Sequence, residues 1–159
     1  MPDSLDPSLP RIFLSAGELA CPERPSIITT VLGSCVSLCL WDRVRCAGGM
    51  NHYALPYPFT ADEEPNARYG AWAIEGLYEC LLEQGSRPAH LEAKLFGGAA
   101  LIPAPQAQLD IGGRNVALGL SELRRLGVPL KARRTGGQHG LLLHFRTDTA
   151  EVLLRRAGG

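Results

Sequence analysis

The sequence predicts an α/β (α+β) layered single domain, with a mixed β-sheet core and two main helices. Its 159 residues are the size of one compact domain. Hydrophobic residues make up 45% of the chain and charged residues 20%, so the chain can fill one buried core. Segments typical of strands precede, separate and follow two stretches of helical periodicity, and this order indicates a layered domain.

Most of the first third of the chain is predicted to form strands. β-branched and apolar residues dominate it, and glycine or proline interrupts each run. A sharp corner, Gly33-Ser34-Cys35, separates two of these strands. The proline-rich residues 55–67 are expected to form a surface loop. The predicted strands cover residues 11–20, with a bend at Gly17, and residues 26–32, 36–41 and 46–53.

Two helices are predicted further along the chain. In residues 69–81, apolar side chains recur at intervals of three and four, which places them on one face of a helix. Asn66 is the expected N-cap of this helix, and Gly85 is expected just beyond its end. The second predicted helix covers residues 115–126 and is closed by Gly127. Further strands are expected at residues 91–96, 130–135, 141–147 and 151–156.

Charge and the N-terminal residues exclude several classes of function. Lys and Arg number 16 and Asp and Glu number 16, so the chain lacks the basic excess that binding to nucleic acid requires. The first ten residues hold three prolines and two acids and contain no apolar run, which predicts neither a signal peptide nor membrane insertion. A cytoplasmic location is therefore expected.

The five cysteines are expected to be reduced thiols. Their number is odd, none forms a C-x-x-C pair, and a chain of this size does not need disulfides. A disulfide between Cys35 and Cys39 is not expected, because residues four apart in a strand lie about 13 Å apart. The cysteine spacing supports no zinc site, and neither a metal nor another cofactor is expected.

Cys35 is the candidate nucleophile. A cysteine is strongly nucleophilic near neutral pH when a histidine or backbone dipoles favour its thiolate. The neighbours Gly33 and Ser34 are small, allow a tight turn and leave backbone amides near the sulfur, where they could support an oxyanion. The other four cysteines are interpreted as small buried hydrophobic residues.

His52 is the preferred base among four histidines. It ends a predicted strand that could pair beside the corner, and its neighbours do not belong to an apolar stripe. His90, at the start of a predicted strand, and His144, within another, fit structural or exposed positions better than a catalytic one. His139, in a predicted loop, remains a second candidate.

A third group could orient the imidazole of such a pair. A hydroxyl or a backbone carbonyl can hold the far ring nitrogen as well as a carboxylate can. Thr29 and Thr30 both lie on the strand that enters the corner, and the residues alone leave the choice between them open.

Two motifs stand close together in the N-terminal half. The run TTVLGSCVSLCLWD is followed by GGMNHYALP, and Cys35 and His52 lie 17 positions apart. Further short motifs follow in order at residues 68–70, 92–99, 111–115 and 135–137. Together these segments resemble the chemoreceptor glutamine deamidases of the CheD family, and the likeness extends roughly from Phe13 to the final strand.

The resemblance implies a CheD-like cysteine hydrolase fold and an enzyme that converts selected glutamines of methyl-accepting chemotaxis receptors to glutamate. The nucleophile would then be Cys35, the base His52 and the orienting residue Thr29, with Thr30 as the adjacent alternative. Gly33 and Ser34 would support the oxyanion. No substrate-binding residue is assigned.

The resemblance also implies a domain division and partners. Residues 1–10 are expected to be a flexible N-terminal segment, and residues 11–159 a single CheD-like catalytic domain. The expected partner is the cytoplasmic domain of a chemotaxis receptor. The alternative is a regulatory binding module, because resembling proteins associate with a CheC-type phosphatase and raise its activity.

The sequence departs from the family pattern at two places. Leu141 follows Gly140 where the family usually has a basic residue, which affects the expected recognition of substrate or partner. The acidic, proline-containing residues 61–67 are also distinct and could reshape the mouth of the site.

Overall fold

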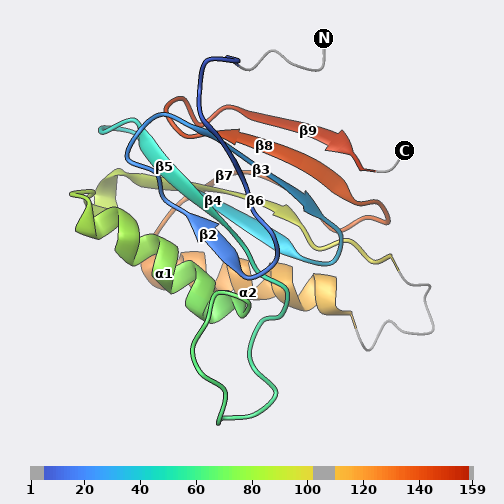
Figure 1. Cartoon of the computed structure of the whole chain (residues 1–159). Coiled ribbons are helices and arrows are strands. Elements are labelled where there is room, and N and C mark those ends of the chain that lie inside the picture. The colour runs from blue at the N-terminus through green and yellow to red at the C-terminus, as the bar shows by residue number, and fades with distance from the viewer. Residues whose placement is uncertain (1–5, 102–109, 158–159) are drawn as a thin grey trace.

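The chain folds into three stacked layers, two β-sheets and one layer of helices (Figure 1). The computed structural model describes residues 6–101 and 110–157. Within these residues, one sheet has the strand order β1-β3-β8-β9 and the other the order β2-β5-β4-β6-β7, and we call them the four-stranded and the five-stranded sheet. Both helices cover the face of the five-stranded sheet that points away from the four-stranded sheet (Figure 1). The elements are β1 (Arg11–Phe13), β2 (Glu18–Ala20), β3 (Ile27–Leu32), β4 (Val36–Asp42), β5 (Ala47–His52), α1 (Gly70–Glu83), η1 (Pro88–His90), β6 (Leu91–Gly97), α2 (Ile111–Leu126), β7 (Leu130–Thr135), β8 (Leu141–Arg146) and β9 (Val152–Arg156).

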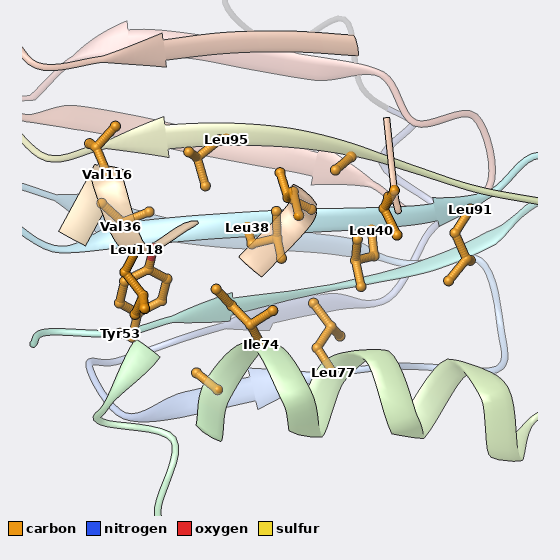
Figure 2. Packing of buried hydrophobic residues seen from close by; sticks show 14 of the residues in the cluster. Val36, Leu38, Leu40, Tyr53, Ile74, Leu77, Leu91, Leu95, Val116 and Leu118 are labelled. Carbon is orange, nitrogen blue, oxygen red and sulfur yellow. The ribbon is translucent and has the colours of Figure 1, made fainter. Parts of the chain in front are cut away.

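The five-stranded sheet contributes to an apolar core on each of its faces. Along β4, Leu38 and Leu40 belong to the core shared with the helices, whereas Cys39 between them belongs to the core between the two sheets. Figure 2 shows Ile74 and Leu77 of α1 reaching toward Leu38 and Leu40. This alternation fixes α1 on one face of the sheet and leaves the other face for the second sheet.

β3 and β8 form the central pair of the four-stranded sheet. They run antiparallel, and Thr30 lies opposite Leu143. Ile28 and Leu32 are buried in the core between the sheets. Because side chains alternate along a strand, Thr30 shares this inner face with Ile28 and Leu32, and Thr29 points to the outer face.

The predicted fold class is confirmed. The described chain is an α+β domain in which two mixed sheets are combined with two main helices. Both sheets are mixed because β1 runs parallel to β3, and β6 runs parallel to β7, beside antiparallel neighbours.

Three local predictions need correction. Tyr69, not Asn66, occupies the N-cap of α1, because the Asn66 side chain instead accepts a hydrogen bond from the backbone N–H of Arg68 at 2.9 Å. α2 starts at Ile111, four residues earlier than expected, because Asp110 caps it. His90 lies in the short helix η1 and not in a strand.

The expected flexible segment 1–10 lies partly outside the described residues, which begin at residue 6. Within the described part, the N–H of Leu9 donates to the carbonyl of Asp6 at 3.3 Å, and the N–H of Ile27 donates to the carbonyl of Pro10 at 2.9 Å. The division between this segment and residues 11–159 therefore remains an expectation.

The position of Leu141 is structural. Its side chain is buried, and it begins β8 opposite Leu32 of β3. A basic side chain at this point would have to enter the buried, apolar end of the β3–β8 pair.

No helix in the described parts of the chain combines the length and apolar character needed to cross a membrane.

Candidate active site

The corner Gly33-Ser34-Cys35 carries the chain from one sheet to the other. β3 of the four-stranded sheet ends just before it, and β4 of the five-stranded sheet begins just after it. All three corner carbonyls accept hydrogen bonds. The donors are the N–H of Ala99 for Gly33 at 2.9 Å, Nδ2 of Asn115 for Ser34 at 3.0 Å, and the N–H of Gly98 for Cys35 at 2.9 Å.

The backbone N–H groups of Ser34 and Cys35 differ from the corner carbonyls in their hydrogen bonding. Among the described residues, no hydrogen-bond acceptor is found for the backbone N–H of Ser34 or of Cys35. The N–H of the candidate nucleophile and the N–H of the residue before it therefore have unused hydrogen-bonding capacity within the described residues. This supports the prediction that the corner can stabilise an oxyanion, which itself stays a prediction.

Cys35 and His52 lie on the same face of the five-stranded sheet. Val36 and Tyr53 exchange two backbone hydrogen bonds of 3.0 and 2.9 Å, which continue the β4–β5 ladder to the end of the sheet. This register makes Cys35 and His52 diagonal neighbours, at a typical Cα separation of about 7–8 Å. Cys35 also packs against the core between the sheets, so its thiol faces the same space as the imidazole.

Thr30 holds His52 from the facing sheet. Its hydroxyl oxygen lies 2.7 Å from Nδ1 of His52 and donates its own hydrogen to the carbonyl of Leu14, also at 2.7 Å. A hydroxyl has only one hydrogen to donate, so Nδ1 of His52 must be the donor in the other contact. The imidazole therefore carries its hydrogen on Nδ1, and Nε2 keeps a free lone pair.

The imidazole and the thiol are not in direct contact. In the described part of the chain, His52 makes no hydrogen bond to the Cys35 thiol. Such a contact is often loose in a protein without substrate and tightens when the substrate binds.

The expectation that Thr29 orients His52 is wrong. The Thr29 hydroxyl lies 2.8 Å from Nδ1 of His144, on the outer face of the four-stranded sheet. Thr29 and His144 are cross-strand partners between β3 and β8, and the two-residue alternation of a strand keeps them away from the inner face. The adjacent Thr30 occupies the orienting position.

Burial shifts the pKa of each candidate group in the direction that favours its neutral form. Desolvation lowers the pKa of His52, although the Leu14 carbonyl and the Glu18 charge act in the opposite direction. Desolvation also raises the pKa of the Cys35 thiol. At neutral pH the site therefore holds a thiol beside a neutral imidazole, so the base has to remove the thiol proton during attack.

The remaining histidines and cysteines lie away from this arrangement. His139 is exposed in the loop between β7 and β8. Cys39 is fully buried in the core, and its burial raises the pKa of the thiol strongly. Cys46 is exposed, and Cys21 and Cys80 are only partly buried, so the interpretation of these three as buried residues is wrong.

Sequence reasoning missed one residue of the site. Asn115 is fully buried and reaches the corner from α2. It lies in a segment that contributes to the CheD resemblance, but an asparagine within a predicted helix carries no signal of its own. Only the packing of α2 against the end of the sheet brings it to Ser34.

The fold and the site define a class: an α+β domain that presents a cysteine and a histidine at one end of a sheet, with the histidine held by a threonine. A family model described as CheD chemotactic sensory transduction matches residues 54–156. The chain belongs to the CheD family.

Proteins of several bacteria are similar to the chain over most of its length. A protein of Rhodospirillum rubrum named "Probable chemoreceptor glutamine deamidase CheD" is 44% identical over 93% of this chain and 83% of its own length. A protein of Anaeromyxobacter dehalogenans with that name and the number 1 is 40% identical over 92% of this chain and 84% of its own. The corresponding protein of Trichlorobacter lovleyi is 40% identical over 92% of this chain and 90% of its own.

Proposed function

We propose that this protein is a protein-glutamine deamidase that converts glutamine side chains of chemotaxis receptors to glutamate. One observation carries the proposal: Cys35 and His52 share a sheet face, and Thr30 fixes the imidazole with Nε2 free to accept a proton. The printed names of the relatives supply the substrate class. The cytoplasmic part of the receptor and a cytoplasmic location for this chain follow from that substrate.

Acylation takes place in two steps. The Cys35 sulfur forms a bond to the carboxamide carbon of the substrate, while Nε2 of His52 takes the thiol proton and the carbonyl electron pair moves onto oxygen. The free amides of Ser34 and Cys35 stabilise the resulting oxyanion. The oxyanion then collapses, the C–N bond breaks, and His52 protonates the departing nitrogen so that ammonia leaves. The product of this half-reaction is a thioester.

Hydrolysis of the thioester completes the cycle. His52 removes a proton from water, and the water oxygen attacks the thioester carbon. The C–S bond breaks, the proton returns to the Cys35 sulfur, and a glutamate side chain is released. The fixed tautomer serves both half-reactions, because the same nitrogen accepts a proton from sulfur and later from water.

The proposal is tested with the full chain and a receptor cytoplasmic fragment. Mass spectrometry should find a gain of one dalton at specific glutamine residues, with release of ammonia. Cys35→Ala should abolish this change, and Cys39→Ala is the matched control because Cys39 lies in the same stretch of sequence but is enclosed in the core. Deamidation that continues undiminished in Cys35→Ala would refute the mechanism.

Association with a CheC-type phosphatase remains a prediction. It is independent of the chemistry, since a binding surface need not include the thiol. Copurification with such a phosphatase that persists in Cys35→Ala, without any deamidation by the natural chain, would favour the regulatory alternative.

A further inference from the structure

Asn115 links the two segments that carry the proposed nucleophile and base. Its Nδ2 donates to the carbonyl oxygens of Ser34 and Ala54, each at 3.0 Å. Ser34 directly precedes Cys35, and Ala54 follows His52 by two residues. The buried carboxamide of Asn115 thus links the segment just before β4 to the segment just after β5.

The hydrogen bond to Ser34 also fixes the direction of an unused amide. In a trans peptide, the carbonyl and the N–H of the next residue point in opposite directions, and the described chain has no cis peptide bond. Because Asn115 holds the Ser34 carbonyl toward α2, the N–H of Cys35 points away from α2. The N–H of Ser34 is fixed in the same way, since Ala99 holds the carbonyl of Gly33.

We infer that Asn115 is a positioning residue, whose carboxamide locks the Ser34–Cys35 peptide so that the N–H of Cys35 serves as an oxyanion donor. The inference rests on the proposed function and adds a part of the site that acts without touching the substrate. Preorganisation is effective here because a donor that is already aimed needs no rearrangement when negative charge develops on oxygen.

The chemistry of the side chain supports a role beyond packing. Oδ1 of Asn115 is buried and has no hydrogen-bond partner among the described residues. An unpaired buried acceptor carries a desolvation penalty, which a leucine with the same branching of heavy atoms would avoid. The polar side chain is therefore a stability cost that its two hydrogen bonds to the site offset.

The test separates positioning of the oxyanion donor from general damage to the fold. Asn115→Leu removes both N–H donors of Nδ2 and keeps the number and branching of the side-chain heavy atoms. Asn115→Asp keeps the shape while replacing the donor with an acceptor. Tyr53→Phe is the matched control, because it removes a hydroxyl that donates to the backbone carbonyl of Asn115 at 2.7 Å and leaves the carboxamide in place. Circular dichroism first confirms that each variant is folded.

Three readouts are compared in each folded variant. The first is kcat and KM for deamidation of a receptor cytoplasmic fragment. The second is the alkylation rate of Cys35 by iodoacetamide, followed on the peptide that contains it, since this displacement at carbon generates no oxyanion. The third is the adduct with [1-13C]propionaldehyde, in which sulfur bonds to the carbonyl carbon, the carbonyl electron pair moves to oxygen, and the thiol proton ends on that oxygen.

In Asn115→Leu we expect kcat to fall by about 10- to 100-fold, with KM and the alkylation rate within about twofold of the natural chain. The propionaldehyde adduct should weaken, and Tyr53→Phe should keep kcat within about twofold. Unchanged kcat and adduct would overturn the inference, and so would equal losses in alkylation and kcat or an equal loss in Tyr53→Phe. If Asn115→Leu does not fold, Asn115→Asp is judged by the same criteria.

The same experiment keeps the two proposals distinguishable. A natural chain that deamidates no receptor fragment contradicts the proposed function, and the propionaldehyde adduct still tests the role of Asn115. A natural chain that deamidates normally, with an equally active Asn115→Leu variant, contradicts only the role of Asn115. If neither Asn115 variant folds, the residue serves the stability of the fold and the inference fails.

Discussion

At the scale of single residues, the contact between Thr30 and His52 predicts opposite effects on activity for substitutions of the adjacent residues Thr29 and Thr30. Thr30→Val keeps the shape of the side chain and removes the oxygen that accepts from Nδ1 of His52. We expect kcat to fall by about 10- to 100-fold with KM nearly unchanged, because the imidazole loses its fixed orientation while the nucleophile stays in place. Steady-state kinetics on a receptor fragment measure both constants.

Thr29→Val is the matched control for this substitution. It removes the hydroxyl that contacts His144 on the outer face, a full layer away from the thiol. Its kcat should stay close to that of the natural chain. The opposite result, with Thr29→Val inactive and Thr30→Val active, would show that His52 is oriented from another direction.

The nucleophile and base candidates could be named from the sequence, but their support could not. Cys35 stands at a glycine corner and His52 at a strand end, and both features are local. The choice between Thr29 and Thr30 depends on which face of β3 meets the other sheet. Buried residues occur at both odd and even positions of β3, so the burial pattern does not identify that face. Asn115 approaches from α2, far along the chain, so no local pattern indicates its partner.

At the scale of elements, the start of α2 is packed closely against the loop after β6. A Cβ atom on Gly112 would collide with the backbone carbonyls of Gly98 and Ala99. We therefore expect Gly112→Ala to lower the free energy of unfolding by about 1–3 kcal/mol, although alanine is intrinsically favoured in a helix by about 1 kcal/mol. Urea unfolding followed by circular dichroism measures this change.

Gly76→Ala in α1 provides the comparison. Its added Cβ would meet only the flexible end of Leu19, at 3.3 Å, so the helix preference of alanine should make this variant neutral or slightly more stable. Equal stability of the Gly112→Ala protein and the natural chain would mean that α2 can move away from the loop at little cost. That result would also weaken the case for a rigid tether at Asn115.

Helix boundaries were predicted less well than helix positions. The apolar stripe locates α1 and α2, because buried residues recur on one face of each. The start of α2 was missed because Gly112 and Gly113 have low helix propensity, whereas the Asp110 side chain accepts from the N–H of Gly113 at 2.9 Å and stabilises that first turn. Tertiary contact with the loop explains why a small residue is needed there.

At the scale of the whole molecule, burial of His52 makes stability depend on pH. The pKa of His52 in the folded protein lies below its ordinary value of 6.5, so the unfolded chain binds a proton that the folded protein does not. The free energy of unfolding should therefore fall as the pH drops from 6.5 toward the lowered pKa. The loss is about 1.4 kcal/mol for each unit by which that pKa is lowered.

Urea unfolding at a series of pH values checks this expectation. His52→Gln removes the titrating group, so the difference between the two proteins isolates the contribution of His52 from that of the carboxylates. A difference that stays constant below pH 6.5 would contradict a lowered pKa. A difference that grows in favour of the natural chain on acidification would indicate a raised pKa.

The overall architecture was predicted only as a class. Strand segments and helices were recognised from composition and periodicity, but the pairing of β3 with β8 joins residues more than a hundred positions apart. β3 and β4 are neighbours along the chain and lie in different sheets. Nothing within the two segments states this, because either strand could pair with the next by a simple hairpin.

The crossing of the chain at Cys35 has a consequence for protein synthesis. Cys35, His52 and Thr30 leave the ribosome in the first third of the chain, but β8, which pairs with β3, and α2, which carries Asn115, come much later. A nascent chain would therefore expose the thiol before the layers that enclose it exist. Oxidants or alkylating agents should reach Cys35 more readily during translation than after release, and we expect deamidation to begin only once the C-terminal strands have joined the sheet.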